Sequence, residues 1–201
     1  MTPPTVTTDL LAYNFNMVTP DLASLLRGRP LDHLGQSFMH DLAREGDVLS
    51  AEALFEAGLD IDRADDEGRR PMHEAAFAGQ LEMVQFLHGA GAILDAPIHP
   101  FGYTALYYAV QQGHIDVASY LLEQGARIDV TERLSGQSLL HTSAARGDMA
   151  MAGILIAAGI DVLAEDTRGQ TARDHAARGN HKELERCLLK VMQHHAVYGG
   201  I

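Results

Sequence analysis

The sequence predicts an all-α solenoid in which short helix-turn-helix units are stacked one on the next. Three observations predict this fold: glycines that recur every 33 or 34 residues, apolar residues at helical spacing between them, and small residues in register within each unit. Because one unit is too short to bury its own apolar face, several units must stack to form a continuous core.

Three interleaved series of glycines define the unit. The first series lies at Gly35, Gly68, Gly102, Gly136 and Gly169, with spacings of 33, 34, 34 and 33 residues. The second follows its first four members by 11 residues (Gly46, Gly79, Gly113 and Gly147), and the third follows the second by 12 (Gly58, Gly91, Gly125 and Gly159). Glycine accepts a left-handed backbone, so the second series is predicted to end one helix and the third to end another.

The first helix of each unit is expected to begin a few residues after the first glycine. Thr104 and Ser138 suit a helix start, and Pro71 suits the first turn. Small residues follow, which would let neighbouring units approach closely, at Ala75-Ala76, Ser143-Ala144 and Ala176-Ala177.

The second helix of each unit is predicted from apolar residues at helical spacing, for example Met83, Val84 and Leu87. About ten residues then separate it from the next unit. They mix apolar and polar residues at short spacing, which predicts short β-hairpin arms at residues 59–62, 93–95, 127–129 and 160–162.

The segment from Asp65 to Gly79 carries a recognisable motif. It reads Asp-Asp-Glu-Gly-Arg-Arg-Pro-Met-His-Glu-Ala-Ala-Phe-Ala-Gly and resembles the ankyrin repeat, whose consensus is D-x-x-G-x-T-P-L-H-x-A-A-x-x-G-H. The stretches Tyr103–Leu106, Gly113-His114 and Leu121–Ala126 match the same consensus. The resemblance covers residues 32–192 and implies an ankyrin-repeat solenoid.

Five repeats are implied, at about 32–64, 65–98, 99–132, 133–165 and 166–192. Residues 1–31 are expected to form an N-terminal extension with a capping helix, and residues 193–201 a C-terminal tail. In the last repeat Arg173 replaces an inward-facing leucine and Asn180 replaces the turn glycine. Polar substitutions suit a terminal repeat, because one of its faces meets water.

The histidines are expected to have structural roles. The resemblance implies that His40, His73 and His141 tie neighbouring loops together by hydrogen bonds, with Tyr107 at the same position in the third repeat. The sequence contains neither metal-ligand spacings of His and Cys nor a nucleophile elbow nor a phosphate-binding loop. We therefore expect no catalytic residues, no metal and no cofactor, and a protein that is not an enzyme.

Composition narrows the class of partner. The net charge of −12 and the pI near 5.2 argue against general nucleic-acid binding, which needs a basic surface. No apolar run is long enough to span a membrane. The single Cys187 suits a reducing compartment, so we expect a cytoplasmic protein. We also expect a monomer that binds another protein in trans.

The resemblance implies that loop tips and first helices line a concave groove and make the partner contacts. This groove is expected to run from acidic through aromatic to basic along the chain. Its predicted partner-binding residues are Asp66, Glu67, Arg69, Phe77, Phe101, Tyr103, Tyr108, Gln137, Arg146, Arg168 and Arg178, and the same face includes Asp41, Arg44, Glu74, Leu134 and His175.

Three functions remain open at this level. The chain could be an adaptor or inhibitor that binds one protein through the groove. It could be a secreted effector that acts on a host or target-cell protein. It could also be an immunity-type inhibitor that occludes the active site of a toxin or enzyme.

Overall fold

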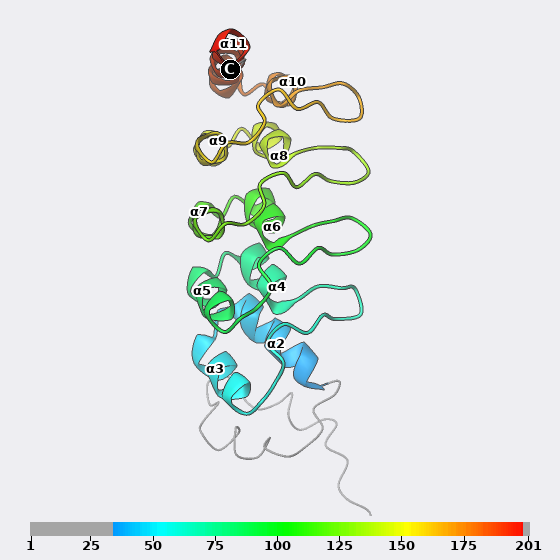
Figure 1. The fold of residues 1–201 in the computed structure, drawn as a ribbon, viewed down its shortest axis with the longest axis vertical. Helices are drawn as coiled ribbons and strands as arrows, with labels where there is room; N and C mark the ends of the chain where they lie inside the picture. The colour runs from blue at the N-terminus through cyan, green and yellow to red at the C-terminus, as the bar shows by residue number, and fades with distance from the viewer. Residues whose placement is uncertain (1–33, 199–201) are drawn as a thin grey trace, which may run out of the picture.

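A computed structural model describes residues 34–198, with side chains from Phe38 to His195. Within this range ten α-helices form five helix pairs, here called units 1 to 5, stacked along one axis (Figure 1). The predicted all-α solenoid of paired helices is thus confirmed. The predicted capping helix in residues 1–31 lies outside the described residues.

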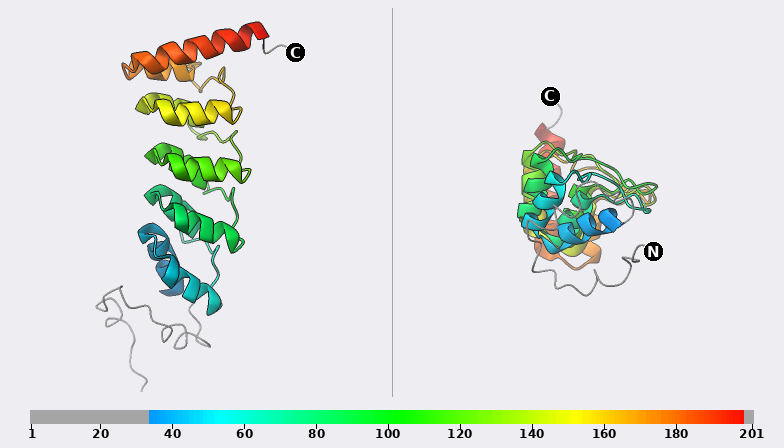
Figure 2. Two further views of the ribbon diagram at one scale, coloured as in Figure 1. Left: turned by 90° about the vertical axis from the view of Figure 1, so that its left-hand side faces the viewer. Right: turned by 90° about the horizontal axis from the view of Figure 1, so that it is seen from below.

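Each unit consists of a first helix and a second helix joined by a tight turn. The first helices are α2 (Leu34–Glu45), α4 (Pro71–Ala78), α6 (Ala105–Gln112), α8 (Leu139–Arg146) and α10 (Ala172–Arg178). The second helices are α3 (Val48–Glu56), α5 (Leu81–Gly89), α7 (Ile115–Glu123), α9 (Met149–Ala157) and α11 (Lys182–Tyr198). The first helices lie between the row of second helices and the loops that connect the units (Figures 1 and 2). We call the side formed by the first helices and the loops the loop face.

The first helices start as the sequence predicts. Pro71 is the first residue of α4, and Thr104 caps α6 by accepting the Tyr107 N–H at 3.3 Å. Ser138 precedes α8, and its N–H donates to His141 Nδ1 at 3.1 Å. These bonds satisfy backbone donors that a helix start leaves unpaired.

The core runs through all five units. Each unit buries large apolar side chains completely, such as Leu106, Leu121 and Leu155. Among the predicted small residues, Ala75, Ala76, Ser143, Ala144 and Ala176 are buried, and this prediction is confirmed for them. It is wrong for Ala177, which is exposed. Ala177 occupies the position of Ala76, which faces the next unit, and no unit follows it in the described residues.

Hydrogen bonds tie each unit to the next, and the predicted histidine roles are confirmed. Nε2 of His40, His73 and His141 lies 2.8–2.9 Å from the carbonyl oxygens of Arg69, Ala96 and Gln170, respectively. Each of these oxygens belongs to the loop that leads into the following unit. Tyr107 takes the same position in unit 3, is buried, and stacks on Tyr103 with ring centroids 4.2 Å apart.

The connecting loops differ from the predicted hairpin arms. In the described loops only single antiparallel bridges form, between Ile98 and Tyr103, Thr131 and Ser138, and Glu165 and Thr171. Residues 61–62 are turn instead of extended arm, because Asp60 accepts the Asp62 N–H at 2.9 Å. Asp161 accepts the Leu163 N–H at the same distance. A short carboxylate side chain that bonds two residues ahead closes a local turn.

The last unit departs from the others. Its first helix ends one residue earlier, and Asn180 adopts the left-handed backbone with φ 60°, as predicted for the residue that replaces glycine. Arg173 is half-buried and forms an ion pair with Glu185 at 3.2 Å. Helix α11 continues to Tyr198, so the predicted tail of residues 193–201 begins as helix (Figure 2).

Candidate functional site

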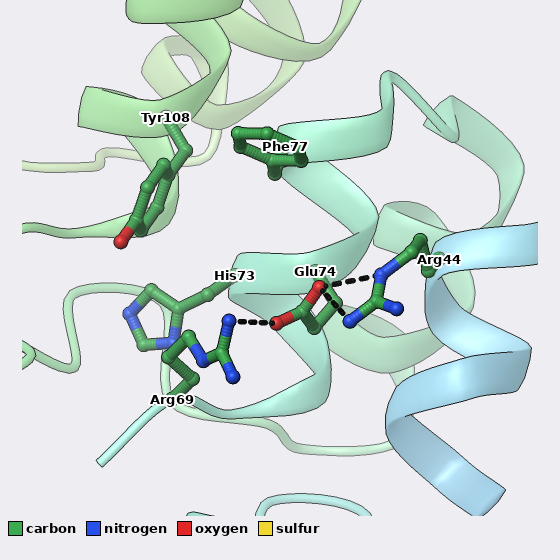
Figure 3. A pocket seen from close by; sticks show the side chains of 6 residues that line it. All are labelled: Arg44, Arg69, His73, Glu74, Phe77 and Tyr108. Carbon is green, nitrogen blue, oxygen red and sulfur yellow. Dashed lines mark hydrogen bonds and ion pairs between the residues drawn. The ribbon is translucent and has the colours of Figure 1, made fainter. Parts of the chain in front are cut away.

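A cleft opens on the loop face between units 2 and 3. Its volume is about 320 Å³, and it is lined by Arg44, Arg69, His73, Glu74, Phe77 and Tyr108 (Figure 3). These residues come from α2, from the loop before α4, from α4 itself and from α6. Side chains from three consecutive units therefore meet in one place.

Glu74 is the buried charge in this cleft. Its side chain is 6% exposed and accepts from Arg44 Nε at 2.9 Å and Arg44 Nη2 at 2.8 Å. Arg69 Nη1 lies 3.3 Å from the other carboxylate oxygen. Glu74 thus lies between two arginines, one from the preceding unit and one from the loop (Figure 3). A carboxylate taken out of water needs such partners, because an unpaired buried charge is very costly.

His73 lies beside Glu74 as a neutral ring. Its Nδ1 accepts the Arg70 N–H at 2.9 Å, so the proton is on Nε2, which donates to the Ala96 carbonyl. Burial lowers the pKa of His73 to about 4. Both ring nitrogens are used in holding the loop, and neither is available for chemistry.

Four aromatic side chains form a continuous patch beside the cleft, and we call Phe77, Phe101, Tyr103 and Tyr108 the aromatic patch. Phe77 meets Tyr108 edge to face at 5.8 Å, and Tyr108 meets Tyr103 at 5.9 Å. Phe101 stacks on Tyr103 with ring centroids 5.3 Å apart. Aromatic pairs in these geometries are stabilising beyond the area they bury.

The two end residues of the aromatic patch are exposed, and the two tyrosines in its centre are half-buried. Phe77 is 44% exposed and Phe101 39%, whereas Tyr103 and Tyr108 are half-buried. Burial raises the pKa of Tyr108, so its hydroxyl stays protonated at neutral pH. The surface thus offers apolar rings together with a phenolic hydrogen-bond donor.

The loop before α4 carries acidic groups to the edge of the cleft. Asp65 Oδ1 accepts the N–H groups of Glu67 and Arg69 at 2.9 and 2.8 Å, which fixes the turn. Arg69 then pairs with Asp65 at 3.1 Å and with Glu67 at 3.2 Å. Asp66 and Glu67 are exposed at this tip.

Comparison with known proteins agrees with this architecture. Residues 39–132 match the family of ankyrin repeats, in three copies. This part of the chain consists of ankyrin repeats. Its helix pairs, its turn residues and its loop-tying histidines are those that the sequence resemblance implies.

The ankyrin array is similar to parts of several other proteins. It is 38% identical over 74 residues to ankyrin repeat and SOCS box protein 3 of Homo sapiens, which is 36% of this chain and 14% of that protein. It is 37% identical over 62 residues to palmitoyltransferase ZDHHC13 of Mus musculus, or 31% of this chain and 10% of that protein. Against myotrophin of Xenopus tropicalis the identity is 41% over 49 residues, or 24% of this chain and 42% of that protein.

These relatives share ankyrin repeats with the chain and no more. The array spans a seventh or less of the first relatives that it matches, and the palmitoyltransferases match it only in their ankyrin part. What the similarity supports is therefore a repeat module of the kind that generally binds proteins.

The array brings together some of the predicted binding residues and separates others. Arg69, Phe77 and Tyr108 line the cleft, Phe101 and Tyr103 extend the aromatic patch, and Asp66 and Glu67 form its acidic edge. Gln137, Arg146, Arg168 and Arg178 belong to units 4 and 5 and do not line the cleft. Arg168 is exposed near a loop tip, whereas Arg178 donates to the Gln170 side chain.

Arg146 has a structural partner that explains its presence. In other units the residue after the turn bonds a carbonyl near the end of the preceding first helix: Gln80 that of Arg44, His114 that of Phe77, and His181 that of Ala145. In unit 4 this position is Asp148, which caps α9 and has no proton to donate. Arg146 instead donates to the Gln112 carbonyl at 3.1 Å.

The sequence did not predict the ion pairs of the cleft. Arg44 and Glu74 were expected on this face as separate partner contacts, and His73 only as a loop tie. The only signal for this ion pair in the sequence was that Arg44 of unit 1 and Glu74 of unit 2 have opposite charges and were expected on the same face. Across the described residues no three His, Cys, Asp or Glu side chains are grouped to hold a metal ion. No helix in the same range is long and apolar enough to cross a membrane.

Proposed function

We propose that the ankyrin array binds a partner protein in trans, as an adaptor or an inhibitor, through the aromatic patch and the neighbouring loop tips. The observation that carries this proposal is the aromatic patch itself. It joins Phe77, Tyr108, Tyr103 and Phe101 into one surface that stays partly exposed at both ends.

Aromatic side chains dominate protein interfaces because they bury much area at little cost in conformational entropy. The rings of the patch are held by one another, so a partner would meet a preformed surface. Leu134, 76% exposed at the next loop tip, adds an apolar contact on the same face. A preformed surface supports binding because less freedom is lost on association.

Charge along the loop face would orient the partner. Residues 1–99 contain 16 acidic and 6 basic residues, and residues 100–201 contain 11 and 9, so the net charges are −10 and −2. Exposed acidic groups lie at Asp66 and Glu67, and exposed arginines at Arg168 and Arg178. Unlike charge at the two ends of a face favours one docking direction and speeds association.

The test is affinity capture with the full chain as bait in an extract of its own cells, read by quantitative mass spectrometry. A double variant, Phe101→Ala with Tyr103→Ala, is expected to weaken capture of the true partner by more than roughly tenfold. The matched control is Phe55→Ala, because Phe55 is also 39% exposed but lies on α3 and pairs with Phe86. Circular dichroism of each variant checks that the array remains folded.

A captured protein that binds the double variant as well as the wild type, yet not the Phe55→Ala variant, would exclude the loop face. Once the partner is known, the finer alternatives separate. Loss of the partner's activity on binding indicates an inhibitor, including the immunity type. A partner found only in a host or target cell indicates a secreted effector.

A further inference from the structure

The cleft beside Phe77 and Tyr108 is small enough for its occupant to be a single side chain. Its volume of about 320 Å³ is at the lower end of the roughly 300–1,000 Å³ usual for small-molecule pockets. Phe77 and Tyr108 form one wall, and the row Arg69, Glu74 and Arg44 lies below it (Figure 3). The chemistry of its occupant follows from the charges of this row and of the edge.

The two arginines of the cleft are already neutralised. Arg44 pairs with Glu74 at 2.8 Å and lies 3.9 Å from Asp41. Arg69 pairs with Asp65, Glu67 and Glu74 at 3.1–3.3 Å. Two cations thus face four carboxylates, which leaves a net charge of −2 in this network. An acidic ligand would have to break existing ion pairs to reach the arginines. A basic ligand would instead pair with the carboxylates that are in excess.

The excess of negative charge lies where a ligand can reach it. Glu67 is 73% exposed and its neighbour Asp66 is exposed as well. The negative charge of Glu67 reaches the Tyr108 hydroxyl, where it adds to the larger effects of burial, Tyr103 and Glu74 that raise the pKa. Glu67 pairs with Arg69, which lines the cleft, so it places an exposed carboxylate near the wall that the two aromatic rings form.

Aromatic faces beside carboxylates favour one kind of group. A guanidinium or ammonium group is attracted to the face of Phe or Tyr within about 6 Å, and a nearby carboxylate completes its hydrogen bonds. The apolar stem of arginine or lysine can lie along Phe77 while its head reaches Glu67. An acidic side chain would meet repulsion from Glu67 and Asp66, and the two arginines of the cleft are already paired with carboxylates.

We propose that the cleft receives an arginine or lysine side chain from a basic segment of the partner protein, held against the wall that Phe77 and Tyr108 form and paired with Glu67 and Asp66. This inference rests on the proposed function, because it names the chemistry of the partner at one point of the loop face. It adds a specificity site at the Phe77 end of the aromatic patch, opposite to Phe101.

A displayed library of random twelve-residue peptides, selected on the full chain, tests the inference without knowledge of the partner. Selected peptides are expected to share an arginine or lysine. Replacing that arginine with citrulline keeps its shape and removes its charge, and should weaken binding by roughly tenfold. A selected lysine is replaced with norleucine for the same purpose.

Variants of the array then place the contact. Phe77→Ala and Glu67→Gln should each weaken the selected peptide by roughly tenfold, and the citrulline peptide should be insensitive to Glu67→Gln. Phe55→Ala and Glu52→Gln are the matched controls, because both residues are exposed on α3. Both control variants should bind as the wild type does.

The inference is overturned if the selection yields acidic or uncharged peptides, or none, or if citrulline binds as well as arginine. Peptides that require Phe101 and Tyr103 but not Phe77 or Glu67 would overturn it while leaving the proposed function intact. A partner that ignores Phe101 and Tyr103 in the capture experiment would instead remove the proposed function itself.

Discussion

A single position of the first helix distinguishes one unit from the next. In units 1 to 5 this position holds Asp41, Glu74, Tyr108, Thr142 and His175. Two residues earlier, the described side chains in units 1 to 4 are apolar and buried: Met39, Met72, Leu106 and Leu140. The apolar position builds the stack, so it varies little in chemistry. The other position faces the loops, and its chemistry in units 2 and 3 creates the cleft.

Near the cleft, buried polar side chains satisfy one another across units. Glu74 depends on Arg44 from unit 1, and His73 depends on a carbonyl of the loop that leads to unit 3. A buried polar group is tolerable only when it is bonded. The same residues therefore shape the cleft and hold three units in register.

His73 gives the array a predictable dependence on pH. Burial lowers its pKa from 6.5 to about 4, while in the unfolded chain it keeps the ordinary value. As pH falls from about 6.5 to about 4, the unfolded chain takes up the proton and the folded one does not. The free energy of unfolding should fall by up to about 3 kcal/mol over this window and level off below it. Urea denaturation at a series of pH values measures this change.

Variants separate the contribution of His73 from those of other groups. His73→Gln should flatten the fall between pH 6.5 and 4, and the exposed His195→Gln should leave it unchanged. Some slope should remain in His73→Gln, because burial also lowers the pKa of His141. The hydrogen bond from His175 holds the pKa of Asp166 at about 2, so its effect appears only below pH 3.8. An unchanged slope in His73→Gln would contradict the assignment.

The turn between the two helices of a unit is also a contact between units. At Gly147 the backbone has φ 71°, and a Cβ there would overlap the imidazole ring of His181 from the next unit. His181 donates to the Ala145 carbonyl at 3.2 Å, which explains why the ring lies so close. The absence of a side chain at this turn thus serves both the backbone and the neighbouring unit.

Two glycines of similar backbone allow these effects to be separated. Gly159 has φ 88° and open space around it, so Gly159→Ala should cost only the left-handed backbone, about 1–2 kcal/mol. Gly147→Ala has the same backbone cost and in addition displaces His181, which should add about 1 kcal/mol or more. Urea denaturation of the two variants measures the difference in the free energy of unfolding.

The double variant Gly147→Ala with His181→Ala serves as the control. Once the ring is gone the overlap disappears, so the double variant should lose less stability than the sum of the two single variants. Simple additivity would show that the turn tolerates a side chain without moving His181.

Elements were predictable from sequence where their cause is local. Glycine spacing and the start residues Pro71, Thr104 and Ser138 act within a few residues, and the helices of the array begin and turn where they indicate. The predicted hairpin arms at residues 59–62 and 160–162 are wrong, because Asp60 and Asp161 close turns there with their own side chains. The ion pairs of Glu74 were not predictable, since they depend on distances between side chains of different units.

At the scale of the whole molecule the described units share one continuous core, which α11 closes at one end. The last helix, α11, has 17 residues, whereas α5, α7 and α9 have 9 each. Leu184 and Leu188 of α11 are buried against the stack, while Glu183, Arg186 and Lys190 meet water. A terminal unit with one polar face closes the core without leaving an apolar surface open.

This architecture predicts that a destabilising substitution in unit 5 lowers the stability of that terminal unit and leaves distant units unaffected. Leu188 is 1% exposed, so Leu188→Ala should destabilise unit 5 by about 2–5 kcal/mol. In a solenoid each unit contacts only its neighbours, so units far from the damage keep their interfaces. Hydrogen exchange read by mass spectrometry should show lost protection in α10 and α11 and unchanged protection in α4 to α7.

The matched variant is Leu121→Ala, which removes the same atoms from a fully buried leucine in unit 3. Because unit 3 has neighbours on both sides, protection should fall in units on either side of it as well as in α6 and α7. Equal loss of protection in every unit with Leu188→Ala would mean that the five units unfold together. The cleft would then share the stability of the terminal helix, and variants of α11 would weaken partner binding without touching the partner.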